Sequence, residues 1–438
     1  MTSGPPRQPD ERSTRSLLKV TSLDAVIIGA GQAGLAASHH LSRRGIEHVV
    51  LERGQLGETW RSQRWDTFAL NTPRWMNRLP GEPDDARDRD AFLTASAWVA
   101  GLEAAAKRDL VPIRERTLVT AVRPRRSGGF VVHAEDGQGA TAVEARAVIV
   151  ASGMLNVPRI PGFASMLPPE VQQLSAAAYR RPTDLRSGAV LVVGSAQSGV
   201  QISEDLVLAG RTVYLATSRV GRVRRRYRGR DTFEWLVMAG FWEGTAAGLP
   251  HPDMLGWPNP QTSGVGARGH TVSLQSLEAL GVRLLGRPAR VRGDRIELDD
   301  TLGEAIAFGD RIALELTALA DRAIDDAGIR APVAEPDPAD APHPDPGGVH
   351  SAPEIDLEAS GVSTIIWATG FGGDLAFLPG DALDEFGRPI HVRGIGALRD
   401  LYYIGLPWMT KRKSGIIHGL DEDGAAIVTH IAARLAGS

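Results

Sequence analysis

Three glycines and an acid form the pattern in this sequence with the clearest chemical meaning. Gly29, Gly31 and Gly34 follow the spacing Gly-x-Gly-x-x-Gly, and Glu52 comes 18 residues after the last of them. The first glycine makes a tight turn, the second lets the backbone approach a pyrophosphate, and the third lets a helix pack against a strand. The pattern predicts a dinucleotide site, in which Glu52 binds a ribose hydroxyl. A glycine turn kept only for packing is the alternative. The candidate cofactor-binding residues at this site are Gly29, Gly31, Gln32, Ala33, Gly34, Glu52 and Arg53.

The chain repeats this arrangement in its second half, with a different residue in the position of the acid. Thr217 lies 18 residues after the last glycine of the repeat, Gly199, and is followed by Ser218 and Arg219. An acid there would repel a 2′-phosphate, whereas Ser and Arg can bind one, so we predict NADP(H) at this site. Because Ala196 replaces the middle glycine, a duplication that no longer binds nucleotide is the alternative. The candidate residues here are Gly194, Ser195, Gln197, Ser198, Gly199, Ser218 and Arg219.

Both glycine turns must be held between a strand and a helix. Apolar runs at 25–28 and 189–193 precede the two turns, helix-forming stretches follow them, and second strands are expected at 47–52 and 212–215. Three further strands are expected at 116–122, 130–134 and 142–150, and a last helix at 421–435. The expected fold is α/β, with two Rossmann-like dinucleotide-binding domains of the three-layer ββα type.

The order of the motifs predicts that one domain is inserted into the other. We expect a disordered leader over 1–22, a first domain over 23–160 plus 350–438, and a second domain over 161–349 with a substrate lid within 220–265. Similar strand ends, Ala151-Ser-Gly153 and Ala368-Thr-Gly370, suggest matched crossing points between the domains. A loop rich in Pro and acidic residues (331–353) leaves the second domain.

Composition excludes several classes of function. The 438 residues carry a net charge of −3, which argues against nucleic acid or an anionic membrane as a general partner. The absence of cysteine excludes a redox disulfide, a thiolate nucleophile and an iron–sulfur cluster, and no metal site is expected. The N-terminus lacks the apolar region of a signal peptide, and no apolar run is long enough to span a membrane. We therefore expect a cytoplasmic location, with a homodimer left open.

Three further segments have two interpretations each. The basic run from Arg222 to Arg230 either supports NADP phosphates or forms a solvated loop. The aromatic residues between Phe233 and Trp257 either cover a substrate pocket or pack in a core. Lys411 to Lys413 either place positive charge near a cofactor ring or form a surface cluster.

The chain resembles the class B flavin-dependent monooxygenases. The resemblance rests on the tandem glycine turns, on Gly57-x-x-Trp60 and on the two Ala-(Ser/Thr)-Gly turns. More narrowly, the stretch from Trp60 through Asn71-Thr-Pro73 and the stretch from Ile366 to Phe371 are similar to bacterial flavoproteins of the flavin-containing monooxygenase type. The resemblance implies FAD in the first domain and NADPH in the second. It implies hydride transfer to the flavin, reaction with molecular oxygen at flavin C(4a), and oxygen transfer from the (hydro)peroxyflavin to a small organic substrate.

The resemblance also assigns residues near the flavin ring. Asn71 matches the Asn that lies beside the flavin in this family, and its neutral amide can hydrogen-bond an oxygen adduct without protonating it, so it is the candidate catalytic residue. A turn Asn before Pro73 is the alternative. Thr59, Trp60 and Arg64 are the other candidates for contact with this cofactor.

Two departures from the family pattern keep other functions open. Ser175 stands where the family has a histidine, and Tyr179 is followed by Arg180 instead of the Trp-Pro of the Baeyer–Villiger enzymes. N- or S-oxygenation or hydroxylation is therefore favoured over ketone insertion. An NADPH-dependent reductase without oxygen insertion is the first alternative, and a non-catalytic flavin-binding redox sensor is the second.

Overall fold

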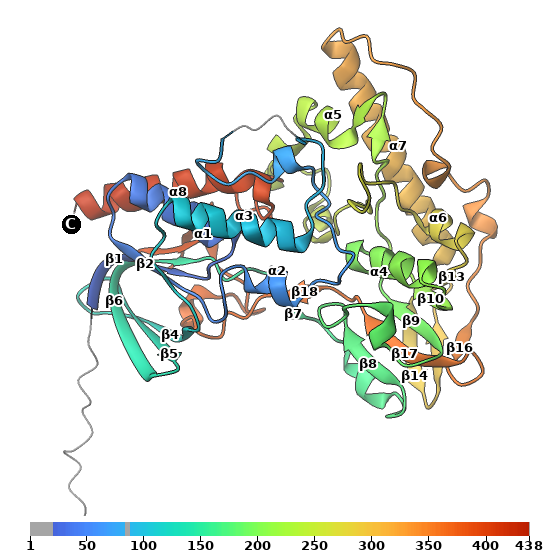
Figure 1. Ribbon diagram of the computed structural model, residues 1–438, viewed down its shortest axis with the longest axis horizontal. Coiled ribbons are helices and arrows are strands. Elements are labelled where there is room, and N and C mark those ends of the chain that lie inside the picture. The colour runs from blue at the N-terminus through green and yellow to red at the C-terminus, as the bar shows by residue number, and fades with distance from the viewer. Residues whose placement is uncertain (1–20, 84–87, 438) are drawn as a thin grey trace, which may run out of the picture.

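Two β-sheets organise the chain, and each carries one of the glycine turns. The computed structural model describes residues 21–83 and 88–437. Residues 1–20 of the leader expected over 1–22 therefore lie outside the described residues. The first sheet lies on the left in Figure 1 and the second on the lower right. The mixed α/β fold with mainly parallel pairing confirms the predicted fold class.

The first sheet has nine strands in the order β19-β20-β21-β6-β1-β2-β3, with β5 on β6 and β4 on β5. Strand β6 changes partner along its length, because its first half pairs antiparallel with β5 and its last residues pair parallel with β21. The strands are β1 (Thr21–Ile28), β2 (His48–Leu51), β3 (Ile113–Arg114), β4 (Leu118–Pro124), β5 (Phe130–Asp136), β6 (Gly139–Val150), β19 (His391–Val392), β20 (Ile395–Gly396) and β21 (Leu401–Tyr403).

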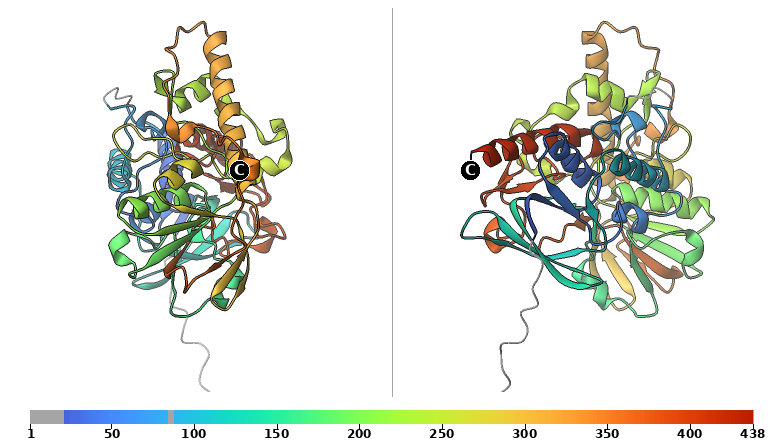
Figure 2. Two further views of the ribbon diagram at one scale, coloured as in Figure 1. Left: turned by 90° about the vertical axis from the view of Figure 1, so that its right-hand side faces the viewer. Right: turned by 60° about the vertical axis from the view of Figure 1, so that its left-hand side comes forward.

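Four helices accompany the first sheet. They are α1 (Gln32–Arg43), α2 (Glu58–Ser62), α3 (Ala95–Arg108) and α8 (Leu420–Ala436). Helices α1 and α8 lie side by side although they come from opposite ends of the chain, and His40 of α1 hydrogen-bonds Asp421 of α8 at 2.9 Å. Figure 2 shows the same pairing from two further directions. The apolar sides of β1, β6 and β21 form the largest buried cluster, which fixes the edge at which the first glycine turn emerges.

The second sheet is entirely parallel, with five strands in the order β13-β10-β9-β17-β8. The strands are β8 (Gln172–Ser175), β9 (Ala189–Val193), β10 (Val213–Ala216), β13 (Arg283–Leu285) and β17 (Val362–Trp367). A small antiparallel sheet of β14 (Pro288–Arg292), β15 (Arg295–Leu298) and β16 (Glu354–Asp356) lies beside it. The helices of this region are α4 (Gln197–Leu208), α5 (Thr232–Met238), α6 (Leu274–Ala279) and α7 (Leu302–Asp326).

The chain crosses between the sheets twice, and the two crossings pair with each other. Strand β7 (Val157–Pro158) hydrogen-bonds antiparallel to β18 (Phe371–Gly372), so the segments that follow the two Ala-(Ser/Thr)-Gly turns lie side by side. The domain boundary expected at residue 350 does not agree with the observed strand pairing, because two strands after this residue still pair with strands of the second region. Strand β17 lies between β8 and β9 in the second sheet, and β16 pairs with β15. We therefore propose that the chain re-enters the first domain only after β17.

The segment between β10 and α6 contains little regular structure. Besides α5 it holds the short strands β11 (Arg226–Tyr227) and β12 (Arg230–Asp231) and three short 3₁₀ helices, of which η4 (Phe241–Glu243) lies nearest the site described below. Helix α5 packs on α7, the longest helix of the described chain, which projects beyond the sheets in Figures 1 and 2. Within residues 21–83 and 88–437, none of the helices has both the length and the apolarity needed to cross a bilayer.

Candidate functional site

The first glycine turn has the geometry that its three glycines predict. Gly29 has a φ of +107°, and a methyl group there would lie 2.6 Å from the carbonyl oxygen of Ala151. A methyl group on Gly34 would lie only 2.0 Å from the carbonyl oxygen of Gly29, so this glycine lets α1 approach the turn. Gly31 differs, because a methyl group there would meet no protein atom within 4 Å. The open space at Gly31, at the N-terminus of α1, fits a pyrophosphate.

Glu52 is held in place by backbone donors. Its Oε2 accepts from the Ala30 N–H at 2.8 Å and its Oε1 from the Gly54 N–H at 2.9 Å, and its side chain is buried. These bonds fix the carboxylate at the C-terminal end of β2, where it lines a cavity, and each oxygen retains a lone pair for a ribose hydroxyl. Arg53, Thr59, Gln32 and Ala33 line the same cavity.

The cavity has a volume of about 770 Å³ and runs from the first glycine turn to the second nucleotide region. Gly29, Gly31, Glu52, Trp60, Arg64 and Asn71 line it from the first region. Gln197, Ser198, Gln201 and Thr262 line it from the second, and residues of α5, η4 and α7 complete the wall. The structure thus brings most of the predicted first-site residues and part of the predicted second-site residues to one space.

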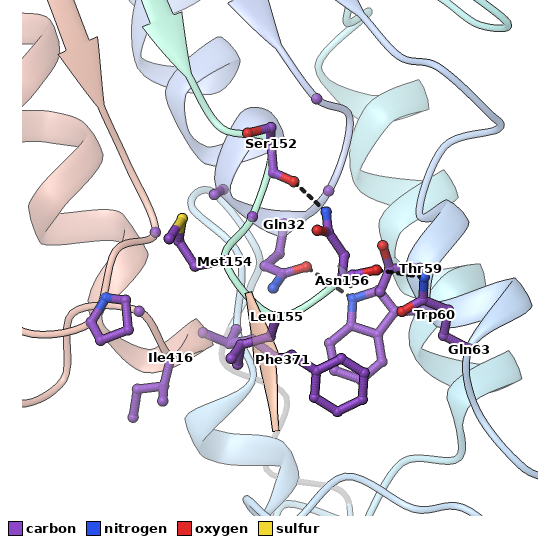
Figure 3. A pocket seen from close by; sticks show the side chains of 18 of the residues that line it. Gln32, Thr59, Trp60, Gln63, Ser152, Met154, Leu155, Asn156, Phe371 and Ile416 are labelled. Atoms are coloured by element: carbon purple, nitrogen blue, oxygen red, sulfur yellow. Dashed lines mark hydrogen bonds between the residues drawn. The ribbon is translucent and has the colours of Figure 1, made fainter. Parts of the chain in front are cut away.

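Three residues that line this cavity and hydrogen-bond one another each have a buried polar atom without a hydrogen-bond partner among the described residues. These atoms are Ser152 Oγ, Asn156 Oδ1 and Gln63 Oε1. Figure 3 shows these side chains around the same opening, together with Gln32, whose Oε1 accepts from Trp60 Nε1 at 2.9 Å. Buried polar atoms are almost always paired, so these three fit a polar ligand such as a flavin ring. None of the three residues is a candidate from the sequence, although Ser152 lies within the Ala151-Ser-Gly153 turn.

Arg64 is partly buried against aromatic rings. Its guanidinium carbon lies 4.7 Å from the centroid of Trp60 and 5.3 Å from that of Phe68, and Nη1 donates to the Gln63 carbonyl at 2.7 Å. Burial, with a smaller effect from the charge of Arg180, lowers the pKa of Arg64 to about 10. Arg64 therefore remains charged at neutral pH and presents a cation to the cavity.

Asn71 connects the two nucleotide regions. Its side-chain Oδ1 accepts from Gln201 Nε2 at 2.6 Å, and its backbone carbonyl accepts from Arg225 Nη1 at 2.8 Å. Gln201 lies on α4, directly behind the second glycine turn, and also donates to the Thr262 carbonyl. Gln201 thus takes one acceptor position on the amide oxygen of Asn71, and the Asn71 side chain is among those that line the cavity.

The second glycine turn repeats the packing of the first. A methyl group at Gly199 would lie 1.7 Å from the Gly194 carbonyl oxygen, and one at Gly194 would lie 2.6 Å from that of Ala368. Ser195, predicted to bind cofactor, is instead fully buried, and its hydroxyl accepts from the Ser218 N–H at 2.9 Å. Its side chain therefore positions the loop and is not available to a ligand. Gln197 and Ser198 do line the cavity.

Arg219 lies outside the cavity, on the surface beside α7. Its side chain is 53% exposed, lies 3.5 Å from Glu304 and stacks on Phe308 at 5.3 Å. Thr217, in the position of the acid, is buried and donates to the Leu285 carbonyl. Gly194, Gly199 and Ser218 also do not line the cavity. Ser218 and Arg219 therefore form a separate surface position next to the second turn.

The two most buried arginines of the run from Arg222 to Arg230 neither support phosphates nor lie in a solvated loop. Arg222 pairs with Asp310 and Asp340, and Arg225 pairs with Asp231 at 2.5 Å, with both arginines nearly inaccessible to solvent. Both guanidinium groups are paired with acidic side chains inside the fold, so they are available neither to phosphates nor to solvent. Arg225 also lies over the rings of Phe92 and Phe233.

The Lys411–Lys413 segment presents an arginine to the cavity, and its lysines point elsewhere. Lys413 lies 2.6 Å from Glu243 and 2.7 Å from Glu422, and Lys411 pairs with the same two acids. The lysine charges are thus paired with carboxylates, which favours the second of the two interpretations, a surface cluster. Arg412, between them, lines the cavity.

One family model and several individual proteins are similar to the chain. A family model described as pyridine nucleotide-disulphide oxidoreductase matches residues 26–229. An uncharacterized CzcO-like oxidoreductase of Geobacillus kaustophilus is 28% identical over 93% of this chain and 98% of its own length. The indole-3-pyruvate monooxygenase YUCCA1 of Oryza sativa subsp. japonica is 33% identical over 42% of this chain and 45% of its own length. The chain is thus similar to an oxidoreductase over nearly its whole length and to a monooxygenase over less than half of it.

A solved structure has a similar fold. A flavin-containing monooxygenase structure from Stenotrophomonas maltophilia superposes with a TM-score of 0.63 over 95% of this chain and 100% of its own, at 18% identity. The space at Gly31, the fixed Glu52 and the unpaired atoms of Ser152, Asn156 and Gln63 fit a flavin nucleotide.

Proposed function

We propose that this enzyme uses FAD and NADPH to transfer one oxygen atom from molecular oxygen to a small organic substrate. The observation that carries the proposal is the single cavity lined by both nucleotide regions, with Asn71 bonded to Gln201 across it. When bound, the flavin supplies the electron transfer and the reaction with oxygen. The chain binds and orients the cofactors and encloses the reacting space.

Each group of residues has a definite task in this proposal. Gly31 and the N-terminus of α1 receive the pyrophosphate of FAD, and Glu52 binds its ribose. Trp60, Arg64 and the Ser152–Asn156 segment border the ring, and Asn71 directs its amide N–H group toward the reaction space. Ser218 and Arg219 bind the 2′-phosphate of NADPH. The aromatic residues of α5 and η4 take the substrate, in agreement with a lid within 220–265.

Rapid mixing of the reduced protein with oxygen tests this function. We expect a transient absorbance that differs from that of both oxidised and reduced flavin, followed by decay that a substrate accelerates. Direct return of the oxidised spectrum with stoichiometric hydrogen peroxide would instead identify the NADPH-dependent reductase. A preparation free of flavin that cannot be reconstituted with FAD would contradict both.

Replacing Asn71 with Ala should uncouple oxygen consumption from product formation. Removing its amide leaves the reaction space without this donor, and a single such donor contributes about tenfold or more to a rate. NADPH oxidation should continue while hydrogen peroxide replaces product, as measured by peroxide yield per NADPH. Gln201→Met removes the donor to Asn71 Oδ1 and to the Thr262 carbonyl but leaves the Asn71 amide in place, so we expect a smaller change in the same direction. Unchanged coupling in Asn71→Ala would remove Asn71 from the mechanism.

Replacing Arg219 with Ala should weaken NADPH but not NADH. Loss of a charge-assisted bond to the 2′-phosphate predicts an increase in KM for NADPH of about tenfold or more. Arg311→Ala is the matched control, since Arg311 stacks on the same Phe308 but pairs with Glu315 at 2.7 Å. Equal effects of Arg219→Ala on both nucleotides would contradict the assignment.

A further inference from the structure

We propose that Arg412 anchors the carboxylate of an anionic substrate whose flat apolar body packs against the aromatic wall of the same cavity. The proposal rests on the proposed function, because it assigns a substrate class to that site. It makes Arg412 and Trp242 the residues that determine specificity.

The guanidinium of Arg412 is held between two rings. Its central carbon lies 4.2 Å from the centroid of Phe241 and 4.6 Å from that of Trp408. Its backbone N–H donates to the Gly244 carbonyl at 2.7 Å, which ties this loop to the segment that carries η4. Stacking fixes the plane of the guanidinium but leaves the N–H groups at its edge free to bind a planar carboxylate.

Arg412 has no carboxylate of its own. Within residues 21–83 and 88–437, no acidic side chain forms an ion pair with Arg412, whereas its neighbours Lys411 and Lys413 share Glu243 and Glu422. Burial lowers the pKa of Arg412, with no acid nearby to offset the loss of solvation. A partly buried cation without a partner is costly, and an anionic ligand removes that cost.

A second unused donor lies next to Arg412. Trp242 Nε1 is buried and has no hydrogen-bond partner in the part of the chain that the structure describes, and Trp242 lines the same cavity. The ring of Trp242 contacts that of Phe241, on which Arg412 stacks, with 5.1 Å between ring centroids. A carboxylate can accept from both groups, since its two oxygens together offer about four acceptor positions.

The rest of the wall suits a flat apolar body. Phe233, Leu236, Val223 and Leu316 line the cavity beside Trp242. The centroids of Phe233 and Trp242 are 5.6 Å apart and their planes are nearly perpendicular, so the wall is lined by both ring edges and ring faces. Aromatic side chains of this kind favour an aromatic or other planar ligand. Together with the cationic end, they select an aromatic carboxylate.

Calorimetric titration of the flavin-loaded protein with phenylacetate and with phenylacetamide tests the proposal. The two probes have nearly the same shape but differ in charge. We expect phenylacetate to bind about tenfold more tightly or better, as a charge-assisted hydrogen bond predicts. Arg412→Ala should abolish this preference, and Arg412→Lys should retain part of it. Lys411→Met removes a neighbouring cation that is already paired, so it should leave the preference unchanged.

Three results would overturn the proposal. They are equal affinity of the wild type for both probes, a preference that survives Arg412→Ala, and slower flavin reduction by NADPH in Arg412→Ala without any ligand. The last result would assign Arg412 to the cofactors. Binding is measured without oxygen transfer, so failure of the monooxygenase reaction would leave this result interpretable, and failure of carboxylate binding would leave the monooxygenase reaction untouched.

Discussion

Replacing Gly31 with valine should weaken flavin binding strongly while the chain still folds. The structure leaves open space where a side chain on Gly31 would point, and its φ of −86° suits any residue. The same space is where we place the FAD pyrophosphate, so the added side chain would collide with the cofactor. Overlap of this kind costs about 1–3 kcal/mol or more, which is roughly a 10- to 100-fold loss of affinity. Flavin content after purification and titration of the apoprotein with FAD measure it.

Gly34→Ala is the matched control for this prediction. Its methyl group would lie 2.0 Å from the Gly29 carbonyl oxygen, so the conflict lies within the protein. We expect a lower midpoint of thermal unfolding for Gly34→Ala even without cofactor, and an apoprotein of Gly31→Val with the stability of the wild-type apoprotein. A Gly31→Val protein that retains full flavin occupancy would show that the pyrophosphate lies elsewhere.

Replacing Arg225 with alanine should destabilise the protein and impair catalysis together. Arg225 and Asp231 form an ion pair in which each side chain is only 1% exposed. Removing the arginine leaves a buried carboxylate without compensation, which typically costs about 3–5 kcal/mol. The Asn71 carbonyl also loses its donor. Chemical denaturation measures the first effect, and product formed per NADPH oxidised measures the second.

A double variant separates the two effects. Arg225→Met with Asp231→Asn removes both charges and keeps an oxygen acceptor for the Phe233 N–H, which Asp231 accepts at 2.9 Å. We expect most of the stability to return while coupling stays low, because Asn71 still lacks its donor. Arg230→Ala controls for loss of a cation in the same segment, since Arg230 is 46% exposed and should contribute about 1 kcal/mol or less. Recovery of full coupling in the double variant would show that Arg225 does not position Asn71.

Local sequence rules predicted the parts of the fold that depend on nearby residues. The glycine spacing predicted both turns because strand, turn and helix are formed by one continuous stretch. The position of Glu52 followed for the same reason. The sequence analysis did not identify α7, although Ile306, Ala313, Leu316 and Ala320 follow helical spacing and are buried.

Contacts between distant segments could not be predicted in this way. The basic run from Arg222 to Arg230 is polar by composition, yet Arg225 is among the most buried side chains because Asp231 and Asn71 meet it in space. Lys411 and Arg412 are adjacent and equally charged, yet Lys411 pairs with Glu243 and Glu422, whereas Arg412 stacks on Phe241 and Trp408 and lines the cavity. Such outcomes depend on the tertiary arrangement and not on any local pattern.

The pairing of β6 with β21 and of α1 with α8 determines the order in which this chain can mature on the ribosome. The first sheet begins near the N-terminus, but β21 and α8 are synthesised only after the whole second sheet. Domains generally fold as units during synthesis, so the inserted sheet can close while the outer one still exposes an apolar edge along β6. Chaperone demand should therefore be concentrated in the interval before the last strand and helix emerge.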